Sequence, residues 1–166
     1  MEYEYNHEAI KGRRIDRAIE ISADLFLKNG IANVKMTDIA EASGIGVATL
    51  YRYFGTKTSI TIAAMTYLWN QMKDMFSEIF ESEIFLSQRG IKQINDLMRM
   101  FIVLYNAHPD FMKLLEEFDL FLAKEKVPKD ELKGYDKSII NFYPIFEKAY
   151  NAGVADGTIR EVKNIR

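Results

Sequence analysis

The stretch Thr37–Lys57, TDIAEASGIGVATLYRYFGTK, decides how the N-terminal part of the chain folds. Helix-forming residues flank two glycines, Gly44 and Gly46, which are two positions apart. Glycine adopts a left-handed backbone conformation at little cost, so Gly44 suits the turn between two helices. Ala40 is small enough for a second helix to cross close above it, and Leu50 would point back into the core. This spacing predicts a helix-turn-helix.

The two helices of this motif are expected at residues 37–42 and 47–54. Thr37 would cap the first helix with its hydroxyl, where exposed backbone amides can also face a phosphate. Gly46 would open the second helix, whose exposed side starts with residues small enough to enter a major groove about 12 Å wide. That exposed side comprises Val47, Ala48, Thr49 and Arg52. The alternative is a helical hairpin with a glycine turn and no nucleic-acid partner.

Nearly every other segment has apolar residues at helical spacing, which predicts an all-α fold. Further helices are expected at residues 11–29, 59–80, 91–107 and 135–151, with another starting at "HPD". Gly30 would cap the first of them, and hydroxyl-bearing residues would open the helix from Ser59. The second half of 91–107 is apolar around most of its circumference, so we expect it to be buried. Pro144 would kink the last helix.

The composition is that of a folded protein: 48% of the 166 residues are hydrophobic and 13% are aromatic. The chain has no cysteine, which excludes disulfides and thiolate metal sites and suits a reducing cytoplasm. The start, "MEYEYNHEAI", is polar and acidic and does not resemble a signal peptide. No run of about 18 apolar residues occurs, so no membrane span is expected. We therefore expect a cytoplasmic protein.

Charge is distributed unevenly along the chain, although the net charge is only −2. Residues 11–57 contain eight Lys or Arg and five Asp or Glu, a net charge of +3. Residues 58–166 contain 14 basic and 16 acidic residues, a net charge of −2. A basic first third is compatible with a face that meets phosphates, and an ordinary solvated surface is the alternative.

The motifs "LFLKNG" at residues 25–30 and "TDIAEASGIGVATLYRYFGTK", with their spacing, resemble the N-terminal domain of TetR-family transcriptional regulators. The resemblance covers about residues 15–60 and extends weakly to "AYNAGVADGTIR" at residues 149–160. It implies a three-helix, helix-turn-helix DNA-binding domain at residues 1–57. A helical bundle that binds a ligand and dimerises would follow at residues 58–166. Since family members usually end in two further helices that build the dimer interface, we expect this chain to lack them.

The resemblance also implies the DNA-contacting residues, which are Thr37, Gly46, Val47, Ala48, Thr49, Tyr51, Arg52 and Lys57. Thr37 and Lys57 would hold phosphates, together with Thr49 and Tyr51, and the other four would lie nearest the base edges. Family members often carry Ser and then Lys or Arg where this chain has Gly46 and Val47. This departure leaves Arg52 as the main candidate for a guanine contact.

The bundle has more large rings than closing its core requires, which favours a pocket for a small apolar or aromatic ligand. The expected lining residues are Trp69, Met72, Phe101, Tyr105, Phe118, Phe121 and Phe142. Arg99 and His108 are candidate polar anchors. The alternative for each ring is an ordinary place in the core, and for each anchor an ordinary solvated position.

The family resemblance implies a homodimeric repressor that binds a palindromic, double-stranded operator and is released by its ligand. An enzyme is not expected, because neither His7 nor His108 has cysteine or carboxylate at metal-ligand spacing, and no glycine-rich phosphate loop occurs. Glu116 and Glu117 are adjacent on a helix and would point apart. No cofactor and no metal are expected. The alternative function is a helical protein-interaction adaptor whose helix-turn-helix is structural.

Overall fold

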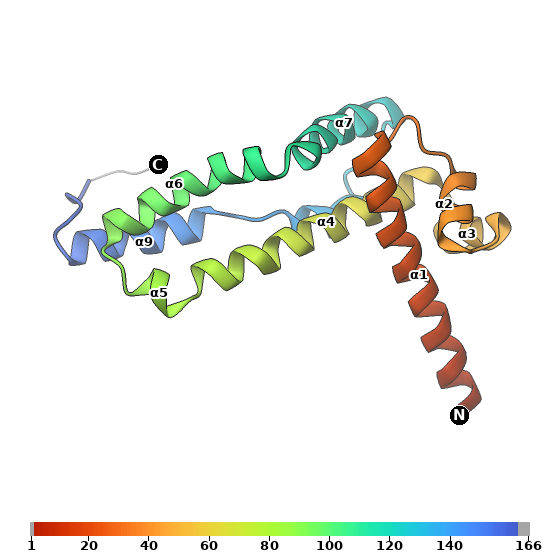
Figure 1. The fold of residues 1–166 in the computed structure, drawn as a ribbon, viewed down its shortest axis with the longest axis horizontal. Coiled ribbons are helices and arrows are strands. Elements are labelled where there is room, and N and C mark those ends of the chain that lie inside the picture. The colour runs from red at the N-terminus through yellow and green to blue at the C-terminus, as the bar shows by residue number, and fades with distance from the viewer. Residues whose placement is uncertain (1, 163–166) are drawn as a thin grey trace. The chain divides into compact units, whose positions relative to one another are not determined.

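The computed structural model describes the backbone of residues 2–162 and the side chains of residues 8–162. Helices are the only regular elements in this part of the chain, which confirms the predicted all-α fold (Figure 1). They are α1 (Glu2–Asn29), α2 (Met36–Ser43), α3 (Val47–Phe54), α4 (Lys57–Phe80), α5 (Glu83–Leu86), α6 (Gly90–Ala107), α7 (Pro109–Glu125), α8 (Lys133–Ser138) and α9 (Tyr143–Ala155). Between residues 2 and 162, no helix is both long and apolar enough to span a membrane.

The helices belong to two compact units. The first unit consists of the described residues up to Asn70 together with Asp110–Ile139. The second consists of Gln71–Pro109 together with the described residues from Ile140 onward. The predicted domain boundary after residue 57 falls at the start of α4, inside the first unit, and it stays a prediction.

The core of the first unit explains the small and apolar residues of the predicted helix-turn-helix. Leu50 and Ile39 are completely buried, and Ala40 is 4% exposed. Gly44 ends α2 with a φ of 70°, the left-handed conformation that an L side chain rarely adopts. The left-handed turn predicted at Gly44 and the buried position predicted for Leu50 are therefore confirmed, and α3 has the predicted bounds.

Aromatic side chains from α4, α7 and α8 also pack together in the first unit. The indole Nε1–H of Trp69 donates a hydrogen bond of 3.1 Å to the hydroxyl of Tyr135. The Trp69 ring meets Phe111 edge-on at 5.4 Å, and the Tyr135 ring meets Phe118 at 5.0 Å. Burial raises the pKa of Tyr135, and the hydrogen bond with Trp69 opposes that shift. These contacts are typical of a packed core in which the polar tips are satisfied.

In the second unit α9 lies alongside α6, and two glycines allow the close approach (Figure 1). A Cβ built on Gly90 would fall 1.9 Å from the backbone nitrogen of Gly153. The chain after α9 turns back onto the start of α6, where Asp156 accepts the backbone N–H of Gly90 at 2.8 Å. The hydroxyl of Thr158 accepts the N–H of Ile91 at 3.3 Å. These bonds satisfy amides at the N-terminus of α6 that have no partner within the helix.

The predicted helix at residues 135–151 is wrong, because two helices occupy this region. The helix α8 ends at Ser138, and α9 starts at Tyr143. Pro144 lies in the first turn of α9, where a missing N–H costs nothing, so it starts a helix and does not kink one. The short helix α5 was not predicted at all, and Ser82 caps it by accepting the N–H of Phe85 at 3.2 Å.

The predicted burial of the second half of α6 is also wrong. Phe101 is 40% exposed, and Ile102, Val103 and Tyr105 are each more than 60% exposed. The buried residues of α6 are Gly90 at its start and Gln93, Leu97 and Met100 on one side of the helix. Apolar residues surround this helix, but its neighbours within the unit cover one side.

Candidate DNA interface and ligand cavity

The helix α3 presents an exposed side next to a fully buried anchor. Leu50 is 0% exposed and holds α3 in the core, while Val47 is 37% exposed. Ala48 and Arg52 are also exposed. The arrangement leaves the start of the predicted recognition helix open to a partner.

Gly46 opens α3, as the sequence predicts. Its carbonyl accepts the backbone N–H groups of Thr49 at 2.9 Å and Leu50 at 3.0 Å. A Cβ added at Gly46 would have no atom of the protein within 4 Å. The backbone at the start of α3 is therefore uncovered, and a ligand surface can approach it closely.

The structure corrects the role predicted for Thr37 at the start of α2. The residue before this helix is Lys35, and the Asp38 carboxylate accepts its N–H at 2.8 Å. Thr37 lies one residue inside the helix, is exposed, and donates its hydroxyl to Asp38 at 3.4 Å. Thr37 is not the capping residue, because Lys35 occupies that position and its carbonyl accepts the N–H groups of Asp38 and Ile39. Its predicted phosphate contact stays a prediction.

Two further predicted DNA contacts, Thr49 and Tyr51, lie on α3. Tyr51 is 48% exposed, and Thr49 is half-buried. The guanidinium of exposed Arg52 lies 5.7 Å from the centroid of the neighbouring Tyr53 ring, within the range of a cation–π contact. Arg52 thus rests against an aromatic ring and remains accessible on the outer side of α3.

Lys57 makes a contact that the sequence did not reveal. Its Nζ donates a hydrogen bond of 2.6 Å to the carbonyl of Ile31, in the turn between α1 and α2. Burial lowers the pKa of Lys57, an effect opposed by the charges of Glu125 and Asp38. An ammonium has three donors, so this bond leaves capacity for a phosphate. The predicted DNA contact of Lys57 stays a prediction.

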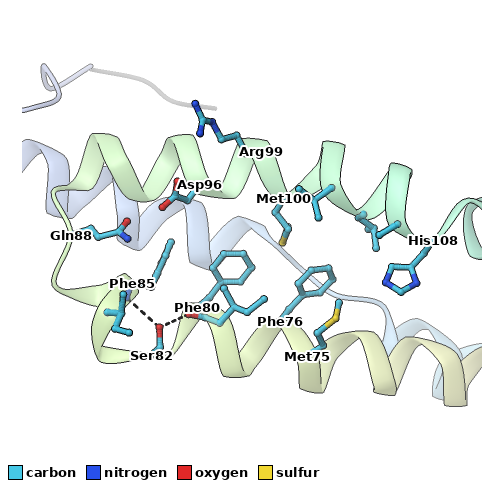
Figure 2. Close-up of a pocket in the computed structure, with 15 residues that line it drawn as sticks. Met75, Phe76, Phe80, Ser82, Phe85, Gln88, Asp96, Arg99, Met100 and His108 are labelled. Carbon is cyan, nitrogen blue, oxygen red and sulfur yellow. Dashed lines mark hydrogen bonds between the residues drawn. The ribbon is translucent and has the colours of Figure 1, made fainter.

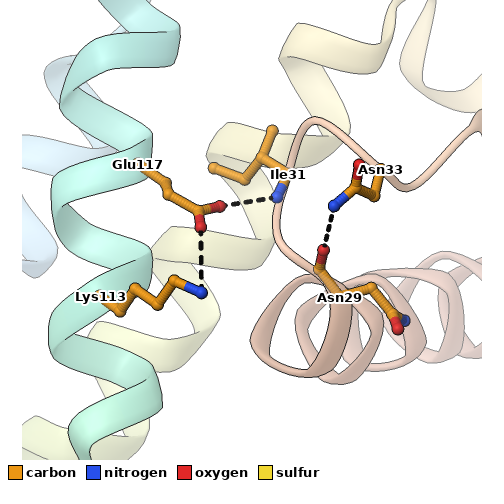
Figure 3. Close-up of polar contacts among 5 residues, drawn as sticks. All are labelled: Asn29, Ile31, Asn33, Lys113 and Glu117. Carbon is orange, nitrogen blue, oxygen red and sulfur yellow. Dashed lines mark hydrogen bonds and ion pairs between the residues drawn. The ribbon is translucent and has the colours of Figure 1, made fainter.

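A second hydrogen bond holds the same turn through the backbone N–H of Ile31 (Figure 3). The carboxylate of Glu117, on α7, accepts the backbone N–H of Ile31 at 3.1 Å, and Lys113 lies 3.9 Å from its other oxygen. Gly30 precedes Ile31 with a φ of 78°, and a Cβ there would fall 2.7 Å from the Glu117 carboxylate. We call Glu117, Ile31 and Lys57 the turn clamp. Sequence reasoning missed it because Ile31 and Glu117 are 86 residues apart.

The second unit contains a cavity of about 550 Å³, well within the range of small-molecule sites (Figure 2). It is lined mostly by apolar side chains of α4, α5 and α6. The lining residues are Met75, Phe76, Ile79, Phe80, Ser82, Ile84, Phe85, Gln88, Asp96, Arg99, Met100, Val103, Leu104, Ala107 and His108. The two candidate anchors, Arg99 and His108, are both in this set.

The seven residues predicted to bind the ligand are absent from the lining of this cavity. Trp69, Phe118 and Phe121 belong to the first unit, whereas Met72, Phe101, Tyr105 and Phe142 belong to the second. The ring of Phe142 lies 5.6 Å from that of Phe76, which does line the cavity. Helical spacing identified apolar helices correctly but did not show which of their sides face a common space. The roles of the seven residues stay predictions.

Comparison with known proteins gives a consistent result for the first third of the chain. Residues 18–64 match the family model described as bacterial regulatory proteins, tetR family. An HTH-type transcriptional regulator of Staphylococcus aureus strain MRSA252 is 29% identical over 149 residues, which are 89% of this chain and 65% of that protein. The HTH-type transcriptional regulator LuxR of Vibrio harveyi is 26% identical over 86 residues, 52% of this chain and 42% of that protein.

A solved structure extends the similarity to most of the chain at the level of the fold. It is the transcriptional regulator FadR from Bacillus subtilis in complex with stearoyl-CoA. The TM-score is 0.53 at 16% identity, covering 89% of this chain and 75% of FadR. The chain spans less than two thirds of the length of the two curated relatives named above.

Proposed function

Since the chain belongs to the TetR family of bacterial regulatory proteins, we propose that it is a homodimeric repressor that a small apolar ligand releases from a palindromic operator. The observation that carries this proposal is the exposed start of α3, with Leu50 buried behind it. Val47 and Ala48 would reach into the major groove, and Arg52 would supply the polar contact to a base. Thr37, Thr49, Tyr51 and Lys57 would contact the backbone of the operator.

Homodimeric binding imposes a spacing on the operator. Two copies of α3 would occupy half-sites whose centres are one helical turn, about 34–36 Å, apart. A ligand that changes the distance between the two copies of α3 would weaken binding to both half-sites at once. By linkage, the operator would weaken ligand binding by the same factor.

The cavity of the second unit is the site that we propose for the ligand. Its walls include three phenylalanine rings, Phe76, Phe80 and Phe85, which are each nearly buried. Apolar cavities with a few placed polar groups are the usual form of small-molecule sites. The helix α4 contributes Met75 and Phe76 to this cavity and begins at Lys57 directly after the helix-turn-helix. It is therefore the element through which we propose that the ligand acts on α3.

Salt dependence of duplex binding tests the DNA-binding part of this proposal. A regulator that neutralises about 6–8 phosphates should lose affinity with a log–log slope of about −5 to −7. Duplexes selected from a random pool should carry inverted repeats, and measured binding should fall on that slope. A chain that binds no duplex, or binds without salt dependence, would instead be the helical adaptor considered from the sequence.

A further inference from the structure

We propose that Gln88 is the specificity anchor of the cavity in the second unit, and that the ligand carries a hydroxyl or N–H donor at one end of an apolar body. This inference rests on the proposed function, because it takes the cavity to be the ligand site. It goes further by naming the chemical group that the site recognises.

Gln88 holds an acceptor that lacks a partner. Its Oε1 atom is buried, and among the described residues it is the buried side-chain polar atom without a hydrogen bond. Buried polar atoms in native proteins nearly always have hydrogen-bond partners, because a buried atom without one costs its full desolvation penalty. Gln88 lines the cavity, and rotation of its terminal amide would bring this oxygen to a donor carried by a ligand.

Hydrogen bonds fix the backbone around Gln88, so its side chain starts from a defined point at the edge of the cavity. The backbone N–H of Gln88 donates to the carbonyl of Phe85 at 3.2 Å. Its own carbonyl accepts a bond of 2.9 Å from Nε2 of Gln93, which is 4% exposed. The same Nε2 donates to the carbonyl of Leu86 at 3.3 Å. Gln93 therefore fixes the turn between α5 and α6, and a fixed turn positions its side chain well for recognition.

The other polar side chains of the cavity already have partners or face solvent. Asp96 is paired with Lys92, and the hydroxyl of Ser82 donates to the carbonyl of Ile79 at 2.7 Å. Arg99 and His108 are exposed. Among the described residues that line the cavity, Gln88 is thus the polar residue with a buried atom that lacks a hydrogen bond.

The rest of the cavity defines the body of the ligand. Figure 2 places Gln88 and His108 near opposite ends of the lining, with the rings of Phe76, Phe80 and Phe85 between them. The Phe80 and Phe85 rings meet edge-on at 5.0 Å. An apolar chain or ring system fits along these side chains, with its donor at the Gln88 end. An alkyl ether or a carboxylate has no donor to offer the Oε1 atom.

Two isomeric probes test whether the ligand must carry a hydrogen-bond donor. They are 1-nonanol, which has a hydroxyl donor, and methyl octyl ether, which has the same molecular formula but no donor. We would measure their affinities for the full chain by isothermal titration calorimetry. The expected result is that 1-nonanol binds about tenfold more tightly, because a site built around a hydrogen bond rejects an analogue that cannot make it.

Substitution then assigns this preference to Gln88. Gln88→Met keeps the length of the side chain without a hydrogen-bonding amide, and Gln88→Leu provides a second apolar replacement. Both should bind the two probes equally, with the ether bound at least as tightly as by the natural chain. Asn95→Leu, at an exposed position of α6 that is not among the lining residues, is the matched control and should keep the preference.

Each other outcome overturns a specific statement. Equal binding of the two probes by the natural chain, or a preference that survives both Gln88 substitutions, would overturn the role of Gln88 and leave the cavity as a ligand site. If neither probe bound, the cavity would fail as the site of an apolar ligand, and the role of Gln88 would fail with it. Duplex binding would still test the regulator itself.

Discussion

The carboxylate of Glu117 accepts the backbone N–H of Ile31 at 3.1 Å, and so joins α7 to the turn that leads into the helix-turn-helix. The carbonyl of the same Ile31 accepts the ammonium of Lys57 at 2.6 Å. Both backbone polar groups of one buried residue are therefore satisfied by side chains from distant parts of the sequence. The turn clamp fixes the segment before α2, and with it the position of the helices that the proposed DNA contacts occupy.

Removing the carboxylate should weaken the first unit. Glu117→Ala leaves the N–H of Ile31 without its partner, so we expect the free energy of unfolding to fall by about 1–2 kcal/mol. Glu117→Gln keeps an acceptor and should lose less. Denaturant unfolding followed by the emission of Trp69, the one tryptophan of the sequence, measures the change in the same unit.

The neighbouring carboxylate provides the control for this experiment. Glu116 is exposed, and Glu116→Ala should change stability by less than about 0.5 kcal/mol. If both alanine variants lost equal stability, the effect would be one of helix charge and not of the clamp.

Lys57 should make stability depend on pH in the alkaline range. Burial lowers its pKa in the fold below the usual value of 10.5, so the unfolded chain binds more protons between the two values. The contribution of Lys57 to stability should therefore rise as the pH increases through its lowered pKa towards 10.5. The measurement is the difference in unfolding free energy between the natural chain and Lys57→Met at several pH values. A difference that stays constant or falls across this range would contradict the assigned environment of Lys57.

Alanine at Gly90 should disrupt the packing of α6 on α9. The new Cβ would meet the backbone of Gly153 at 1.9 Å, and backbone atoms cannot move aside as a flexible side chain can. We expect a loss of about 3 kcal/mol or more in unfolding free energy, measured by circular dichroism in denaturant. Gly134→Ala, in α8, meets no atom within 4 Å and should be neutral or slightly stabilising. Equal behaviour of the two variants would contradict the close approach of these helices.

Arg52→Ala should relax sequence preference, as the base contact proposed for this residue requires. A bidentate contact to one base is worth about 1–3 kcal/mol, so discrimination at a single operator position should fall by that amount. Competition binding with operators that differ at one base pair measures it. Arg89→Ala, an exposed arginine of the second unit, should leave the preference intact. Unchanged discrimination in Arg52→Ala would assign the readout to other residues of α3.

The sequence predicts best where local chemistry decides the structure. The bounds of α3 and the left-handed conformation of Gly44 follow from a short stretch in which the turn favours glycine and the buried side of the helix requires an apolar residue. The α8–α9 break was missed because apolar spacing continues across it, and Pro144 fits equally well inside a kinked helix or at the start of a new one. Spacing along the chain cannot distinguish these two possibilities.

The cavity and the turn clamp depend on contacts between distant segments, which helical periodicity does not encode. Phe101 and Phe76 have the same chemistry, yet Phe101 is 40% exposed whereas Phe76 is buried and lines the cavity. Gln88 lies in a polar stretch that sequence reasoning treated as a connection. Its isolation becomes visible only when the surrounding side chains are in place.

Residues that follow α9 accept hydrogen bonds from the backbone at the start of α6, and this has a practical consequence. Asp156 and Thr158 supply the acceptors for the first amides of α6, and the backbone N–H of Ile159 donates to the carbonyl of Gly153 at 2.9 Å. A version of this chain shortened to end at Ala155 would keep the residues of α1 to α9 but lose the hydrogen bonds from Asp156 and Thr158 to the start of α6. Any trimmed fragment made for crystallisation or spectroscopy should therefore extend beyond Ile159.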